Sequence, residues 1–121
     1  MCAPGLTIEE FFAQSQPWER PVFDRVRSHL DDLGPLIVEP VQVGILFKNG
    51  PTFAELRPKK KWIALSFMHP VPQASNRFSR KITRVGGTGS RYYHVLNVDD
   101  PGQIDEQVND WLTEAYFEAE R

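Results

Sequence analysis

The sequence predicts an α+β fold, in which an antiparallel β-sheet of four to five strands has N-terminal helices and a C-terminal helix packed against it. Apolar residues recur at helical spacing near both ends of the chain, whereas the middle alternates with period two between turn signals. The chain has 121 residues, which is enough for one hydrophobic core. We therefore expect a single domain over residues 1–121, with residues 1–6 disordered.

Two helices are expected before the sheet. Thr7 and Glu10 have the spacing of a capping box, so a short helix should begin there and end before Pro17. A second helix is predicted from Pro21 to Leu33, because proline suits the first helical position and apolar residues recur along one side. The Gly-Pro pair that follows is a strong stop signal.

The middle of the chain predicts strands joined by turns. Residues 41–48 alternate in the manner of a strand, and Asn49-Gly50 then signals a hairpin. A glycine-rich turn, GGTGS, separates the last two predicted strands. The predicted strands are residues 41–48, 52–57, 61–67, 81–85 and 91–98.

The last part of the chain predicts one helix. Asp100 is a good N-cap, and Pro101 suits the first helical position after it. Apolar residues then recur at helical spacing from Ile104 onward. Trp111 and Tyr116 lie in this stretch, and we expect both rings to anchor the core.

Basic residues are concentrated in the middle of the chain, although the net charge is only −2. Residues 48–94 contain ten Lys or Arg residues and a single acid, Glu55. Residues 1–47 contain seven acids and three bases, and residues 95–121 contain eight acids and one base. Such polarity means that the segments either pair with one another or offer a basic surface to an anionic partner.

The leading hypothesis is a non-catalytic binding module whose basic sheet and loop surface meets an anionic partner, either nucleic acid or an acidic protein surface. Lysine clusters bind phosphates with release of counterions, and the Trp62 ring that ends RPKKKW could stack on a base. A solvated turn or a guarded edge strand would have the same composition. The candidate binding residues are Lys48, Arg57, Lys59, Lys60, Lys61, Trp62, Arg77, Arg80 and Lys81.

The alternative is a self-contained interaction or oligomerisation domain, monomeric or homodimeric, whose basic strands compensate its acidic helices. Exposed ion pairs of this kind stabilise by only about 0–1 kcal/mol each. We expect the bases of the 57–61 turn and the 77–81 loop to lie beyond the reach of the helices. A third possibility, a small-molecule pocket, rests on aromatic rings that core packing explains equally well.

The sequence predicts no catalytic residues, no metal site and no cofactor. His29, His69 and His94 lack metal-ligand spacing, and Cys2 stands alone. A nuclease metal ion needs several carboxylates, and residues 48–94 offer one. The sequence therefore favours a non-catalytic protein without deciding against every activity.

The ends of the chain also bear on where it acts. The start, MCAPGLTIEE, lacks the basic and apolar regions of a signal peptide, so we expect none. No stretch approaches the roughly 20 apolar residues of a membrane span. A cytoplasmic protein without a membrane partner is expected.

The chain contains, in order, the phrases TIEEFF, PWERPVFDRVRSHLDDLGP, VGILFKNGPTFAELRPKKKWIALSF and VNDWLTEAY. This series resembles the uncharacterised domain-of-unknown-function family 5655 over about Thr7 to Tyr116. The third phrase and the closing DWLTEAY are its most specific parts. The resemblance implies a cytoplasmic bacterial α+β domain, found alone or joined to other domains. The family defines no activity and no catalytic residues, so the resemblance supports the fold and leaves function open.

Overall fold

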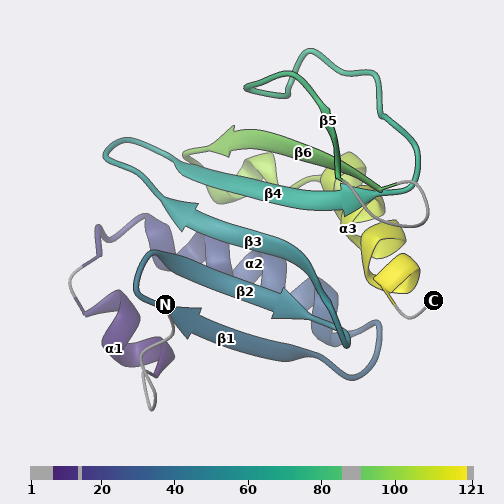
Figure 1. Ribbon diagram of the computed structural model, residues 1–121. Coiled ribbons are helices and arrows are strands. Elements are labelled where there is room, and N and C mark those ends of the chain that lie inside the picture. Colours follow the sequence, from purple (N-terminus) through teal and green to yellow (C-terminus); the bar gives the residue numbers. More distant parts are fainter. Residues whose placement is uncertain (1–6, 14, 86–90, 120–121) are drawn as a thin grey trace.

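The computed structural model describes residues 7–13, 15–85 and 91–119. Within them the chain forms an antiparallel sheet of six strands in the order β1-β2-β3-β4-β6-β5 (Figure 1). The predicted α+β class is confirmed, with six strands instead of four to five. The strands are β1 (Ile37–Val41), β2 (Gly44–Lys48), β3 (Thr52–Pro58), β4 (Ile63–His69), β5 (Thr83–Val85) and β6 (Arg91–Val98).

Two helices cover one face of this sheet. Helices α2 (Glu19–Asp31) and α3 (Glu106–Ala119) lie behind the strands in Figure 1, and the short helix α1 (Ile8–Phe12) lies beside β1. Strand alternation turns Ile45, Leu56 and Leu65 toward α2 and α3, where all three are buried. Apolar burial between the sheet and these helices therefore forms the core.

The N-terminal helices follow from local signals. The Thr7 hydroxyl accepts a hydrogen bond from the Glu10 amide at 3.0 Å, and the Glu10 carboxylate accepts one from the Thr7 amide at 2.9 Å. The predicted capping box is therefore confirmed. Helix α2 begins two residues before the predicted start, at Glu19, and Gly34 follows its end with φ +146°.

The prediction of one strand over residues 41–48 is wrong. Gln42 and Val43 form a turn between β1 and β2, and Val41 pairs with Gly44 across it. The run looks continuous in sequence because the two turn residues keep the alternation of polar and apolar side chains. Strand β1 instead lies earlier, at the sheet edge, where Pro40 removes no central ladder bond.

The remaining hairpins agree with their predicted positions. Gly50 has φ +81° in the turn between β2 and β3. The Lys59 amide donates to the Trp62 carbonyl at 2.7 Å and closes the turn between β3 and β4. Strands β5 and β6 pair around the predicted GGTGS turn, but residues 86–90 lie outside the described residues, as do residues 1–6 and their predicted disorder.

The start of the final helix differs from the prediction. Asp100 does act as an N-cap, but it caps a short 3-10 turn, η1 (Pro101–Gln103), and α3 begins only at Glu106. The side chain of Asp105 then accepts the Val108 amide at 3.1 Å, which caps α3 itself. Trp111 and Tyr116 are buried as predicted.

Candidate binding face of the sheet

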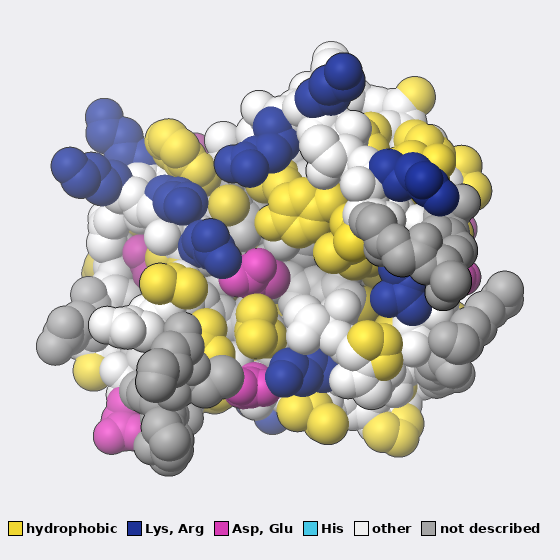
Figure 2. Space-filling view, in the orientation of Figure 1, with side chains coloured by type: hydrophobic (Ala, Val, Ile, Leu, Met, Phe, Trp, Pro, Cys, Tyr) yellow, Lys and Arg dark blue, Asp and Glu magenta, His cyan; other side chains and the backbone are white. Residues whose placement is uncertain are grey.

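The sheet has a second face, opposite α2 and α3, which we call the open face. One row of open-face residues crosses four neighbouring strands. In it, Leu46 pairs with Glu55, Glu55 with Ser66, and Ser66 with Val95. Their neighbours in each strand point into the core, so alternation directs this row away from the helices. Figure 2 shows hydrophobic side chains across the middle of this face and Lys and Arg side chains along its upper rim.

Two aromatic residues belong to the open face. His94 is buried in the core, so its neighbour Tyr93 points to the opposite side, where it pairs with Met68. Trp62 precedes the core residue Ile63 and is 39% exposed. The sequence prediction included Trp62 but missed Tyr93. The alternation of residues 91–98 would have revealed it, once one buried position was known.

The first predicted basic cluster lies at the turn between β3 and β4. Lys59, Lys60 and Lys61 are exposed, and none of them forms an ion pair with any described residue. Arg57 differs, because its guanidinium donates to the Glu55 carboxylate at 3.0 Å on the open face. The turn therefore offers three lysines to solvent.

The second cluster lies on the segment that leads into β5. Arg80, Lys81 and Arg84 are exposed, and within the described chain none of the three has an ionic partner. The sequence already groups Arg84 with these bases, and its place in the short strand β5 depends on pairing with β6.

The expectation that the helices cannot reach the 77–81 loop is wrong for Arg77. Its guanidinium donates to both Asp105 oxygens at 3.0 and 3.1 Å and to the Gln103 carbonyl at 2.8 Å. Burial alone would raise the pKa of Asp105, but the hydrogen bonds and charge of Arg77 bring it below its usual value. Arg77 thus ties its loop to the start of α3. Lys48 likewise pairs with Glu39 on β1.

The two basic clusters lie on the same side of the molecule. Phe78 pairs with Leu96, and the Ser79 amide donates to the Val95 carbonyl at 2.8 Å, so the second cluster follows the edge of β6. Strand β6 lies next to β4, but the clusters are offset along the strands: the first precedes Ile63, which pairs with Val98, whereas Arg84 pairs with Tyr92. Figure 2 shows Lys and Arg side chains along this rim.

The comparisons with known proteins identify a family. The family described as "Domain of unknown function (DUF5655)" matches residues 8–118. The chain belongs to this family. A search of curated proteins and a search of solved structures each found no match for the DUF5655 chain. Its function must therefore be argued from its own surface.

The described part of the DUF5655 chain contains no group of three or more His, Cys, Asp or Glu side chains arranged to bind a metal. None of its helices, within the described ranges, is both long and apolar enough to pass through a bilayer.

Proposed function

We propose that the protein is a cytoplasmic, non-catalytic binding module that holds single-stranded nucleic acid on the open face of its sheet. One observation carries the proposal: six exposed bases without a described ionic partner follow the rim of a face whose middle contains hydrophobic side chains beside the Arg57–Glu55 pair. They are Lys59, Lys60, Lys61, Arg80, Lys81 and Arg84.

The chemistry of the face favours an unpaired strand. Lysines and arginines along a rim can follow a phosphate backbone, and binding gains free energy from the counterions that the phosphates release. Unpaired bases would then lie over the sheet, where Tyr93 and Trp62 offer rings for stacking. A duplex keeps its bases stacked inside, so it would use the rim but not the rings.

The predicted binding residues divide into two groups in this proposal. Lys59, Lys60 and Lys61, together with Arg80 and Lys81, contact phosphates, and Trp62 stacks. Lys48, Arg57 and Arg77 already hold acidic side chains, so they support the surface instead of contacting the strand first. An acidic protein surface remains the second partner class, because the basic rim alone would attract it equally.

The first prediction concerns oligonucleotide binding and its dependence on salt. A fluorescein-labelled oligouridine should bind at low salt, as measured by fluorescence anisotropy. Contacts to about four phosphates would give a slope of log K against log salt concentration of roughly −3. The double change Lys59→Glu with Lys61→Glu should raise the Kd at least about tenfold and flatten that slope.

A matched control reverses the same number of charges on the helical layer. Arg25→Glu with Arg27→Glu lies on α2 and should leave the Kd within about twofold, since screening weakens its effect at a distance. If both double variants lost the same affinity, the effect would come from net charge and not from the position of the two lysines. No binding of any oligonucleotide at low salt, together with binding of poly-glutamate, would assign the rim to an acidic protein.

The alternative function is an interaction domain in which the basic segment compensates the acidic helices. The pair between Arg77 and Asp105 is the observation in its favour. If such pairs also join two copies, the particle should be dimeric at low salt and smaller at high salt, because salt screens exposed pairs. Light scattering after gel filtration measures this directly. A monomer at both salt concentrations would restrict compensation to one chain.

A further inference from the structure

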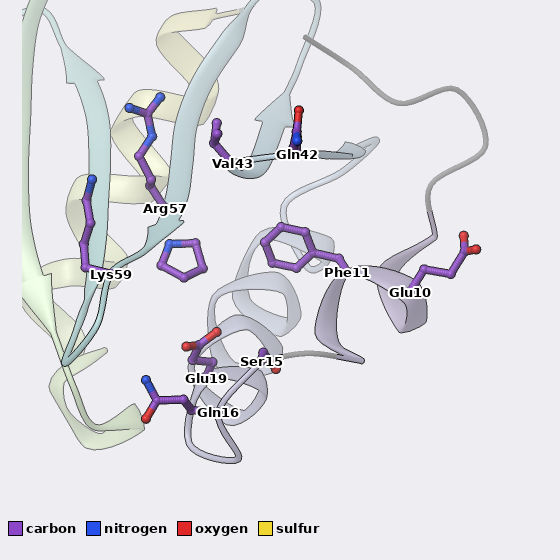
Figure 3. A pocket seen from close by; sticks show the side chains of 10 residues that line it. Glu10, Phe11, Ser15, Gln16, Glu19, Gln42, Val43, Arg57 and Lys59 are labelled. Atoms are coloured by element: carbon purple, nitrogen blue, oxygen red, sulfur yellow. The ribbon is translucent and has the colours of Figure 1, made fainter.

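A groove of about 950 Å³ opens between α1, the turn between β1 and β2, and the end of β3. Figure 3 shows that Phe11 and Glu19 point toward its centre from the helical side, whereas Glu10 points away. Arg57 and Lys59 extend along the opposite wall (Figure 3). The groove is separate from the middle of the open face and shares only the end of β3 with the basic rim.

The walls are fixed to one another. The Gln16 side chain donates to the Lys60 carbonyl at 2.6 Å, which joins the connection between α1 and α2 to the turn after β3. The Trp18 indole donates to the same Gln16 amide at 3.2 Å and holds its orientation. Gln16 thus connects the two sides of the groove.

Glu19 is the unusual residue of this groove. It is the first residue of α2 and only 4% exposed, yet none of the described ion pairs includes its carboxylate. Burial raises the pKa of the Glu19 carboxyl above its usual range, and a backbone hydrogen bond from Gln16 opposes that rise. A buried carboxylate without a cation is costly, so a cationic group that enters the groove would gain by pairing with it.

The groove has the opposite charge on its other wall. Lys59 is exposed and has no ionic partner in the described chain, whereas Arg57, two positions earlier, is paired with Glu55. The groove is also lined by the Phe11 ring, Pro58 and Val43, and Val43 is 53% exposed. An exposed apolar side chain in a groove offers contact area to a ligand.

We propose that this groove binds a small amphoteric molecule, with an amino or guanidino group against Glu19, an anionic group against Lys59, and an apolar linker across Phe11 and Pro58. Amino acids and short peptides belong to this chemical class. The Phe11 ring would add a cation–π contact to the bound amine. If Glu19 only held the turn that begins at Gln16, the apolar lining of Phe11 and Pro58 and the facing Lys59 would have no role.

The probe for this site is 6-aminohexanoate, which carries an amine and a carboxylate at opposite ends of an apolar chain. Backbone amide signals of Gln16, Glu19, Val43 and Lys59 should shift in nitrogen–proton NMR spectra as it is added. We expect a Kd near or below about 1 mM. Hexanoate and hexylamine each lack one charged end and should bind at least about tenfold more weakly.

Three substitutions separate ligand binding from a structural role. Glu19→Gln keeps the shape of the side chain and should raise the Kd for 6-aminohexanoate at least about tenfold. Glu10→Gln, on a lining residue that points away, should leave it within about twofold. Lys59→Gln should weaken 6-aminohexanoate but leave hexylamine binding unchanged, because hexylamine uses only the Glu19 end.

Two results would overturn the proposal. One is the absence of shifts in the groove amides with every probe up to about 50 mM. The other is equal affinity of folded Glu19→Gln and unmodified protein for 6-aminohexanoate. Oligonucleotide binding should be the same in both proteins, so this test and the test of nucleic-acid binding can fail independently.

Discussion

Gly44→Ala is expected to lower the free energy of unfolding by about 3 kcal/mol. The added Cβ would lie 2.5 Å from the Leu56 carbonyl oxygen and 3.3 Å from the Cα of Arg57. Both are backbone atoms of β3, so no side-chain rotation can make room. Strand β2 would have to move away from β3, which weakens the ladder that places Ile45 opposite Leu56. Urea denaturation followed by tryptophan fluorescence measures the loss.

Gly102→Ala is the matched control for this change. Its Cβ would meet the side-chain oxygen of Asp100 at 3.1 Å, and that side chain is exposed. We expect its free energy of unfolding to change by less than about 0.5 kcal/mol. A Gly44→Ala protein as stable as the control would show that β2 and β3 tolerate a wider separation. Gly44→Ala should also weaken 6-aminohexanoate binding, because the neighbouring residue Val43 lines the groove.

The parts of the fold that the sequence predicts well depend on contacts within a few residues. The capping box of Thr7 and Glu10 needs only helical geometry over three positions, and its two hydrogen bonds are present. Asp100 likewise caps the turn that follows it. The turn at Gly50 depends on one positive φ angle, which glycine allows. These features do not require knowledge of the rest of the chain.

The parts that the sequence predicts poorly depend on distant partners. Strands β1 and β2 fold back on one another, so that Ile37 pairs with Lys48 eleven positions away, while the local pattern remains that of one strand. Arg77 resembles the other exposed bases in sequence, but the fold brings Asp105 to its guanidinium. Local composition cannot distinguish a base that meets an acid from one that stays free.

The candidate sites divide in the same way. Lys59, Lys60 and Lys61 were accessible to prediction because three consecutive lysines cannot all be buried. Glu19 was not, since an acid at the start of a predicted helix is expected to be exposed there. Its burial arises only when the connection between α1 and α2 is bonded to the turn after β3 through Gln16.

The second large effect is expected from His94, which is 0% exposed and stacks on Phe67 with ring centroids 4.9 Å apart. Its Nε2 accepts the Gln73 amide at 3.0 Å, which leaves Nδ1 to donate to the Tyr92 carbonyl at 2.9 Å. Both ring nitrogens are therefore used by the neutral form. Protonation would place a second hydrogen against the Gln73 amide and a charge within an aromatic cluster.

The direction of the pH effect follows from the pKa of His94. Burial lowers it from the usual value of 6.5, the Tyr92 carbonyl raises it in part, and the charge of His69 lowers it further. Between this lowered pKa and the pKa of the unfolded chain, the unfolded state binds more protons. The free energy of unfolding should therefore fall as pH drops below about 6.5, by up to about 1.4 kcal/mol per pH unit.

His94→Phe separates this titration from the other ionisable groups. Phenylalanine keeps the stack on Phe67 but cannot accept the Gln73 amide, so it should cost about 1–3 kcal/mol at pH 7.5. Between pH 7.5 and pH 5.5 the variant should lose less stability than the unmodified protein. Protonation of Glu19 should instead raise the free energy of unfolding as pH falls, because its pKa is higher in the folded state than in the unfolded chain. The difference between the two urea-denaturation profiles therefore isolates His94, and parallel profiles would show that its protonation is not linked to folding.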